Sequence, residues 1–407
     1  MTTSNPKIDA LLSEAAARGD VPGVIAMATD GKATIYEGAF GVRELGGTRP
    51  MRIDTVCWIH SMTKAVTGAC MMQLVEQGRI GIDDDCGRWV EALAKPKVLE
   101  GFDSAGKPRL RPARGAITLR RLLTHTAGFV YDNWNADMLR YNTMTGLSRV
   151  ETFARPENCQ PLSFDPGTRW HYGINIEWAG KVLEAITGGS LDSYMQKNVC
   201  GPLRMASTGY RLTPEISERL SGVHQRFEDG HLEHVAWEPP QQPEDFLGGG
   251  GLYSTAGDYV RFIRAILNGG ALDGERILKP ETVELMGRSH IGDIQGAGIV
   301  RTVRREMSFD ADLFPGMRTG WGLSYLINEE DVPGRRRAGS LTWAGLRNTY
   351  FWIDPRQGIG GTIMTQLLPF ADPTVLRLYE AFESAVYEAA RGRRGAASGQ
   401  VVNDYCR

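Results

Sequence analysis

The chain has 407 residues, of which 42% are hydrophobic, enough to bury one large core or two smaller ones. Its 46 lysine and arginine side chains nearly balance 48 aspartate and glutamate side chains, for a net charge of −2. This balance excludes an electrostatic argument for binding nucleic acid or a membrane surface. The sequence shows neither an apolar stretch of roughly 20 residues, as a membrane span needs, nor a recognisable signal peptide. A cytoplasmic protein is therefore expected.

The cysteines and histidines indicate neither a disulfide framework nor a metal site. Six cysteines and seven histidines are scattered, without the spacings of Cys-x-x-Cys or His-Glu-x-x-His motifs. Reduced thiols are expected, and no metal or cofactor is predicted. The sequence does not determine the oligomeric state.

The N-terminal part predicts a helix followed by a β-hairpin. Residues 6–18 carry apolar side chains at helical spacing, whereas residues 23–40 contain two strand-like runs. Asp30-Gly31 between these runs is a strong hairpin signal, because such a turn favours positive φ angles. A short strand near residues 55–59 then leads into a second helix.

The second helix begins with Ser61-Met-Thr-Lys64 and is expected to stop at Gly78. Its side chains are apolar nearly all round, which predicts burial. The spacing of three places the Lys64 amine on the same face as the Ser61 hydroxyl. A lysine in a buried site is costly unless it is paired or neutral, so this turn indicates chemistry. The alternative is an ordinary helix cap at Ser61, with Lys64 reaching into solvent.

Residues 85–245 are predicted to be mainly helices and loops, since they contain few strand-like runs. A short helix is predicted over residues 117–123. Asn175 can cap another helix, over residues 176–186, which stops at Gly188. These patterns predict an inserted, mainly helical domain.

The C-terminal part returns to strands. A glycine run at residues 248–251 precedes an amphipathic helix over 256–268, and short β-rich runs then occupy residues 322–367 before a last helix. Strands near both ends of the chain indicate one antiparallel sheet flanked by helices, an α+β fold. The predicted sheet domain is therefore discontinuous, comprising residues 1–84 and 246–407, with a cleft beside the inserted region.

A serine nucleophile needs a base, and the Gly-x-Ser-x-Gly elbow of common esterases is absent from this sequence. Lys64 is one candidate if burial favours its neutral form. A tyrosine beside the lysine cation is another, because positive charge favours the phenolate. Tyr131 and Tyr172 compete for this role, and for either of them a structural tyrosine is the alternative.

Five motifs follow one another in an order that characterises one enzyme superfamily. They are Ser61-Met-Thr-Lys64, Leu122-Leu-Thr-His-Thr-Ala-Gly128, Tyr172, Gly248-Gly-Gly-Gly-Leu-Tyr-Ser254 and Trp343-Ala-Gly345. On these residues the chain resembles serine hydrolases of the class C β-lactamase superfamily, most of all the family VIII carboxylesterases. Residues 98–107 and 170–180 also resemble the fungal acyltransferases of statin biosynthesis. The resemblance implies a fold like that of β-lactamases and penicillin-binding proteins.

The resemblance also implies a catalytic set of Ser61, Lys64 and Tyr172. In such relatives the catalytic tyrosine stands in the later block, which maps to Tyr172 and leaves Tyr131 to line the pocket. Ser61 would attack an ester carbonyl while Tyr172, its phenolate favoured by Lys64, takes the proton. The backbone N–H groups of Ser61 and Leu346 would form the oxyanion hole. Water or an acceptor alcohol would then release the acyl group.

The substrate pocket is expected to be lined by Tyr131, Trp343, Ala344, Gly345, Asn175 and Gly250. Two departures from the family pattern matter here. Ile174 stands two residues after Tyr172, so the Tyr-x-Asn motif is not kept. Trp343-Ala-Gly345 replaces Lys-Thr-Gly, which removes the cation expected to hold a β-lactam carboxylate and favours neutral esters over penicillins.

The expected function is a serine carboxylesterase that acts on short- to medium-chain, small-molecule esters. Acyl transfer to an alcohol or amine would use the same residues, and weak β-lactam hydrolysis is a further alternative. A catalytically silent scaffold is the alternative outside enzymes. The presence of Ser61, Lys64 and Tyr172 together argues against it.

Overall fold

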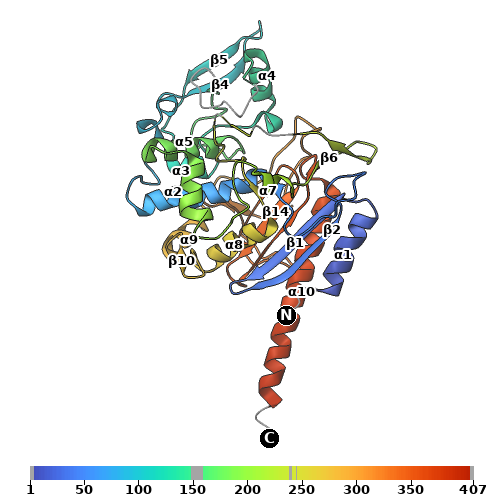
Figure 1. Cartoon of the computed structure of the whole chain (residues 1–407). Coiled ribbons are helices and arrows are strands. Elements are labelled where there is room, and N and C mark those ends of the chain that lie inside the picture. Colours follow the sequence, from blue (N-terminus) through green and yellow to red (C-terminus); the bar gives the residue numbers. More distant parts are fainter. Residues whose placement is uncertain (1–3, 148–158, 238–240, 244, 404–407) are drawn as a thin grey trace.

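The computed structural model describes residues 4–147, 159–237, 241–243 and 245–403, and side chains as far as residue 392. Its centre is an antiparallel sheet with the strand order β11-β12-β13-β14-β15-β1-β2 (Figure 1). The strands are β1 (Gly23–Asp30), β2 (Thr34–Gly41), β11 (Thr319–Trp321), β12 (Leu326–Asn328), β13 (Ser340–Gly345), β14 (Thr349–Asp354) and β15 (Ile359–Met364). Because β1 pairs with β15, the prediction of one antiparallel sheet built from both ends of the chain is confirmed.

Helices and smaller sheets surround the central sheet. The described helices are α1 (Pro6–Ala17), α2 (Thr63–Glu76), α3 (Leu119–Leu123), α4 (Ala136–Thr145), α5 (Asn175–Thr187), α6 (Leu191–Met195), α7 (Pro214–Ser217), α8 (Ala256–Leu267), α9 (Pro280–Met286) and α10 (Pro373–Asn403). The small sheets pair β3 (Cys57–Trp58) with β8 (Tyr253–Ser254), β4 (Lys97–Phe102) with β5 (Pro108–Pro112), β9 (Ala271–Leu272) with β10 (Glu275–Arg276), and β16 (Leu367–Leu368) with β6 (Val223–Arg226) and β7 (Leu232–Val235).

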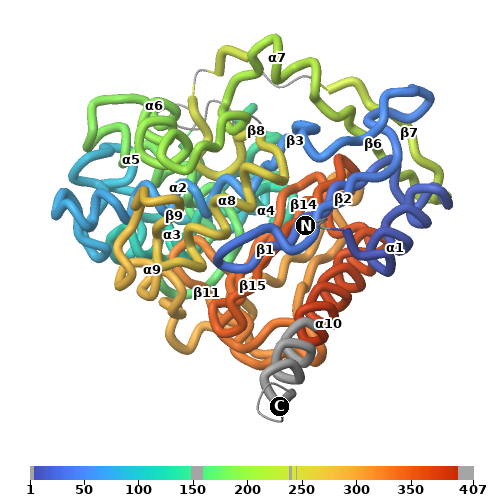
Figure 2. Tube along the Cα trace, turned by 60° about the horizontal axis from the view of Figure 1, so that its bottom comes forward, coloured from blue at the N-terminus to red at the C-terminus, as the bar shows by residue number. Residues whose placement is uncertain are grey.

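Helices cover both faces of the central sheet. Phe351 of β14 contacts Tyr259 of α8 at a ring-centroid distance of 5.2 Å, while the next residue, Trp352, contacts Phe382 of α10 at 5.7 Å. Successive strand residues point to opposite faces, so α8 and α10 lie on opposite sides of the sheet. Figures 1 and 2 show α1 beside α10.

The turn between β1 and β2 differs in detail from the prediction. Neither Asp30 nor Gly31 is among the described residues with positive φ. Instead, the Asp30 carboxylate accepts hydrogen bonds from the backbone N–H groups of Lys32 and Ala33, each at 2.7 Å. The aspartate side chain thus closes a three-residue connection without a left-handed backbone.

The buried helix α2 has the predicted position, but Ser61 does not belong to its α-helical part. Ser61 lies in a 3-10 turn, His60–Met62, which leads directly into α2. Every residue of α2 from Thr63 to Leu74 is buried, and Gly78 takes a φ of 67° just after the helix. His60 adopts a φ of 45°, uncommon for a residue other than glycine. The turn that carries Ser61, His60–Met62, therefore leads into a helix that is buried over most of its length.

Residues 85–245 contain helices α3 to α7, in agreement with the predicted helical texture, and also a hairpin that the sequence did not indicate. This hairpin, β4 with β5, lies at the outer end of the region, close to α4 (Figure 1). Within the same region, β6 pairs with β16, so this strand is joined to the C-terminal part of the chain. The domain boundaries near residues 84 and 246 stay a prediction.

Candidate active site

The side chain of Lys64 is fully buried and makes three polar contacts. Its Nζ lies 3.1 Å from Ser61 Oγ, 3.1 Å from the Tyr131 hydroxyl and 2.6 Å from the carbonyl oxygen of Gly249. An ammonium group has three N–H donors, and each of them finds one of these acceptors. This geometry suits a protonated Lys64 that holds the Ser61 hydroxyl in place and supplies a positive charge beside it.

Gly249 is needed for the contact between its carbonyl and Lys64. A Cβ at this position would lie 2.4 Å from Oε2 of Glu177 and 2.5 Å from Oε1. Only glycine therefore allows the backbone to run between the ammonium of Lys64 and the carboxylate of Glu177. The glycine run of the sequence thus forms part of the wall of the site.

Glu177 is a buried carboxylate that the sequence analysis did not single out. It lies in the first turn of α5, is 1% exposed and accepts a hydrogen bond from the Tyr131 hydroxyl. Burial, followed by the charge of Glu177, raises the pKa of Tyr131 well above its usual value. Tyr131 therefore stays protonated and links Lys64 to Glu177. The sequence does contain a signal for this residue, because Glu177 lies between the apolar residues Ile176 and Trp178. A charged side chain between apolar neighbours in a core helix indicates a buried, functional carboxylate.

Tyr172 occupies a different position around Lys64. The Lys64 Nζ lies 4.8 Å from the centroid of the Tyr172 ring, and the Tyr172 hydroxyl accepts a hydrogen bond of 3.0 Å from the indole N–H of Trp343. Among the described residues, no hydrogen bond joins this hydroxyl to Ser61. The indole N–H of Trp343 thus fixes the position of the Tyr172 oxygen, and the Lys64 amine lies over the Tyr172 ring.

A cavity of about 210 Å³ opens beside these residues and reaches Ser61. Four of the predicted pocket residues line it, namely Tyr131, Trp343, Ala344 and Gly250. The wall is completed by further side chains, many of them aromatic: Trp58, His60, Asp132, Asn133, Trp134, Tyr172, Glu177, Trp237, Leu247, Gly249, Arg304, Met307, Leu346 and Phe370. Such a wall favours an apolar acyl or alcohol group.

Asn175 and Gly345 were predicted to line the pocket, and the structure places both elsewhere. Asn175 is fully buried, and its amide nitrogen lies 3.1 Å from Nδ1 of His125 and 2.9 Å from the carbonyl oxygen of Phe129. Asn175 is also the first residue of α5 rather than its cap, because Ile174 precedes the helix without a side-chain cap bond. Its amide instead holds neighbouring loops together.

Gly345 of β13 packs against the backbone just before Ser61. A Cβ at this position would lie 2.3 Å from the carbonyl oxygen of Ile59, so the lack of a side chain lets β13 approach the nucleophile turn. The following residue, Leu346, lines the cavity together with Ser61. In the described part of the chain, no backbone carbonyl accepts a hydrogen bond from the N–H of Ser61 or Leu346. Both donors are thus available to a substrate oxygen, as the predicted oxyanion hole requires.

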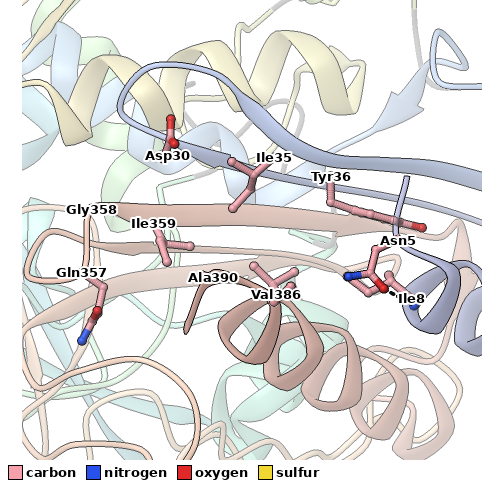
Figure 3. A pocket seen from close by; sticks show the side chains of 11 residues that line it. Asn5, Ile8, Asp30, Ile35, Tyr36, Gln357, Gly358, Ile359, Val386 and Ala390 are labelled. Carbon is pink, nitrogen blue, oxygen red and sulfur yellow. Dashed lines mark hydrogen bonds between the residues drawn. The ribbon is translucent and has the colours of Figure 1, made fainter. Parts of the chain in front are cut away.

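A second cavity, of about 160 Å³, lies between α1, α10 and the β1–β2 hairpin (Figure 3). Its apolar side chains include Ile8, Ile35 and Val386, and of its polar residues Asn5, Asp30 and Tyr36 form hydrogen bonds within the fold. Ser61 and Lys64 are not among its residues. This cavity therefore offers no comparable chemistry.

Neither a metal cluster nor a membrane span emerges from the described residues. No three His, Cys, Asp or Glu side chains gather there in an arrangement that could hold a metal ion. No described helix is both long and apolar enough to cross a membrane. The five cysteines in the described part, Cys57, Cys70, Cys86, Cys159 and Cys200, are free.

Comparison with known proteins identifies the family of the chain. A family model described as Beta-lactamase matches residues 8–385, most of the chain. The chain belongs to the beta-lactamase family. The predicted superfamily and the predicted β-lactamase-like fold are thereby confirmed.

Within the beta-lactamase family, the chain is similar to fungal proteins named as an acyltransferase and as an esterase. It is 33% identical to a monacolin J acid methylbutanoyltransferase of Aspergillus terreus, over 90% of this chain and 92% of the relative. It is 30% identical to a lovastatin esterase of Penicillium rubens, over 95% of this chain and all of the relative. The prediction of an enzyme of the serine hydrolase type is confirmed at this level, and the resemblance to the statin acyltransferases is confirmed as well.

Solved structures of the beta-lactamase fold show the same relationship. An unliganded simvastatin synthase from Aspergillus terreus superimposes with a TM-score of 0.82 at 30% identity, covering 94% of this chain and 98% of the other. A hydrolase with promiscuous acyltransferase activity, named EstCE1, superimposes with a TM-score of 0.72 at 21% identity, covering 93% and 97%. At this lower identity, the second likeness shows the fold alone.

Proposed function

We propose that the protein is a serine carboxylesterase that forms an acyl-enzyme on Ser61. The observation that carries the proposal is the 3.1 Å contact between Ser61 Oγ and the buried amine of Lys64, at the wall of a largely aromatic cavity. A hydroxyl held by a buried cation, with two unused N–H donors beside it, has the parts that acyl transfer needs.

Tyr172 is the better candidate for the base that takes the Ser61 proton. Tyr131 donates its hydroxyl hydrogen to Glu177, and this arrangement keeps Tyr131 neutral. The Tyr172 oxygen instead accepts a hydrogen bond from Trp343, and its ring lies beside the Lys64 cation, so both groups are placed to offset charge that develops on this oxygen during the reaction. Catalytic hydrogen bonds often tighten only when substrate is bound, so the lack of a Tyr172–Ser61 hydrogen bond among the described residues is compatible with this role.

The proposed reaction has two steps, formation of the acyl-enzyme and its hydrolysis. Ser61 Oγ attacks the ester carbonyl as its proton passes to Tyr172, and the N–H groups of Ser61 and Leu346 bind the oxyanion. The carbon–oxygen bond to the alcohol breaks, and the alcohol leaves with the proton from Tyr172. Water attacks the acyl-enzyme with Tyr172 again as the base, which releases the acid and restores Ser61.

Acyl transfer to an alcohol is the second candidate function. It is favoured by the 33% identical relative, named as a methylbutanoyltransferase, just as the relative named as an esterase favours hydrolysis. The acyl-enzyme is common to both reactions, and they differ only in whether water or an alcohol attacks it. Trp343 in place of a lysine argues against β-lactams, because the cation that would hold their carboxylate is missing beside the reacting carbonyl.

The test compares the native protein with Ser61→Ala, using p-nitrophenyl butyrate and intact mass spectrometry. We expect release of p-nitrophenol and a transient butyryl adduct with the native protein, and background release without adduct from Ser61→Ala. Equal release by both proteins would contradict the assignment of Ser61. Adding butanol and measuring butyl butyrate against butyrate then separates acyl transfer from hydrolysis, since excess ester product would favour the transferase.

A further inference from the structure

Arg347, the residue after Leu346, is a buried cation for which the described residues supply no counter-charge. It is 2% exposed, and its Nε and Nη2 have no hydrogen-bond partner within the described residues. Its guanidinium carbon lies 4.6 Å from the ring centroid of Trp58 and 4.6 Å from that of Trp237. The two indoles hold the side chain in one orientation and stabilise its charge in part. They do not accept the hydrogen bonds of its N–H groups.

Arg347 faces a cavity of about 430 Å³ that adjoins the candidate active site. Trp58 and Trp237 line both this cavity and the one that reaches Ser61. Tyr253 and Gln366 also line the cavity of Arg347. Arg347 follows the proposed oxyanion donor Leu346 directly, and the two cavities share Trp58 and Trp237, so the two sites are neighbours.

The acidic group in this cavity does not neutralise Arg347. Of the described lining residues, only Glu44 carries a carboxylate, and it is engaged by Arg49 at 3.7 Å and by His234 at 3.8 Å. Burial lowers the pKa of Arg347 to about 9, which reflects how little the surroundings compensate its charge. A buried cation in such a state is costly unless an anion joins it.

The geometry of the Nε and Nη2 groups of Arg347 indicates which kind of anion they can bind. Nε and Nη2 lie on one edge of a guanidinium, and their two parallel N–H bonds match the two oxygens of a carboxylate. We propose that Arg347 binds a carboxylate in this cavity, and that the substrate is an ester that carries this carboxylate away from its reacting carbonyl. The second part rests on the proposed esterase function, whereas the carboxylate site itself does not.

The first experiment tests the site without catalysis. Thermal unfolding of the native protein is measured with glutarate and with the neutral analogue glutaramide, at matched ionic strength. We expect glutarate to raise the melting temperature by several degrees and glutaramide to leave it unchanged. Arg347→Met, which keeps a long apolar stem between the indoles, should abolish the shift. Arg49→Met, an arginine on the wall of the same cavity, is the matched control and should keep it.

The second experiment identifies which side of the ester bears the carboxylate. Mono-p-nitrophenyl glutarate is compared with p-nitrophenyl butyrate for the acyl side, and 4-carboxyphenyl butyrate with phenyl butyrate for the alcohol side. We expect one carboxylate ester to have at least a tenfold lower KM than its neutral partner, and we expect Arg347→Met to remove this preference.

The outcomes separate the two proposals. Stabilisation by glutarate that depends on Arg347, together with no ester hydrolysis, would keep the carboxylate site and reject the esterase. Hydrolysis of neutral esters with no carboxylate preference and no stabilisation by glutarate would overturn the site and leave the esterase standing. Equal stabilisation of the native protein and Arg347→Met would also overturn the site, because the anion would then bind elsewhere.

Discussion

Tyr131 donates its hydroxyl hydrogen to the carboxylate of Glu177, and its oxygen accepts a hydrogen bond of 3.1 Å from Lys64. A buried negative charge is thus connected to the buried ammonium through one phenol. Such a chain stabilises the cation that holds Ser61, and it leaves the second oxygen of Glu177 without a partner among the described residues. We infer that Glu177 is a positioning residue for Lys64.

Glu177→Gln should lower kcat by about tenfold with little change in KM, because the neutral amide keeps the shape but removes the charge that supports Lys64. The pKa of Tyr131 should fall towards its usual value, since Glu177 contributes to raising it. Steady-state kinetics as a function of pH check this. Glu184→Gln is the control, because Glu184 lies in the same helix but pairs with Lys181. An equal loss in both variants would indicate a general effect on the helix.

The two tyrosines should differ in their effect on the rate. Tyr172→Phe removes the proposed base and should lower kcat by about 10² to 10⁴-fold. Tyr131→Phe removes only a link between Lys64 and Glu177, and a smaller loss is expected. Measuring kcat for p-nitrophenyl butyrate with both variants decides between them. A larger loss for Tyr131→Phe would reverse the assignment of the base.

Trp343→Phe keeps an aromatic wall but removes the N–H group that contacts the Tyr172 oxygen. A hydrogen bond to a charged group contributes about 1.5–3 kcal/mol, so kcat should fall by roughly tenfold or more. Trp134→Phe is the matched control, because the Trp134 ring lies 5.3 Å from the Tyr172 ring while its N–H binds Ser308. If both substitutions act alike, the N–H of Trp343 has no special role.

Gly345→Ala should damage both stability and activity. The added Cβ meets the carbonyl oxygen of Ile59 at 2.3 Å, and either β13 or the nucleophile turn must move. Overpacking of this kind costs about 1–3 kcal/mol of the free energy of unfolding. Gly250→Ala, which meets nothing within 4 Å, provides the control. Thermal unfolding and ester hydrolysis are measured together, and a fully active, fully stable Gly345→Ala would refute the close approach.

Acid should destabilise the protein partly through His125, which is fully buried. Burial, then the charge of Lys64, lowers the pKa of His125 well below its usual value, so the folded state keeps this side chain neutral. Below about pH 6.5 the unfolded chain binds a proton that the folded chain does not. Stability therefore falls as the pH falls, by up to about 1.4 kcal/mol per pH unit for one histidine.

The substitution His125→Asn should weaken this dependence by about one proton. Asparagine suits the position because it tolerates a left-handed backbone, and His125 has a φ of 57°. Urea unfolding at pH 7 and pH 5 provides the comparison with the native protein. An unchanged difference in the free energy of unfolding between the two pH values would show that His125 takes up protons while folded.

Much of the fold and part of the candidate site could be predicted because they depend on local patterns. The periodicity around Ser61 and Lys64 predicted a buried helix, and α2 is buried from Thr63 to Leu74. The β4–β5 hairpin was missed because β5 begins and ends with proline and its central residue, Leu110, is 41% exposed. β5 has no buried residue, and the buried residues of β4, Val98 and Leu99, are adjacent, so neither strand shows the alternation of a half-buried strand.

The spacing of three between Ser61 and Lys64 by itself determined that a hydroxyl and an amine would lie together, since side chains one helical turn apart share a face. Only the tertiary structure decided what surrounds this pair. Glu177 reaches Tyr131 from α5, the carbonyl of Gly249 reaches Lys64 from a distant loop, and Arg347 lies between Trp58 and Trp237. These contacts join residues that are far apart in the chain, whereas periodicity describes only residues that are close in sequence. The charged groups around Ser61 are therefore brought together by tertiary packing alone.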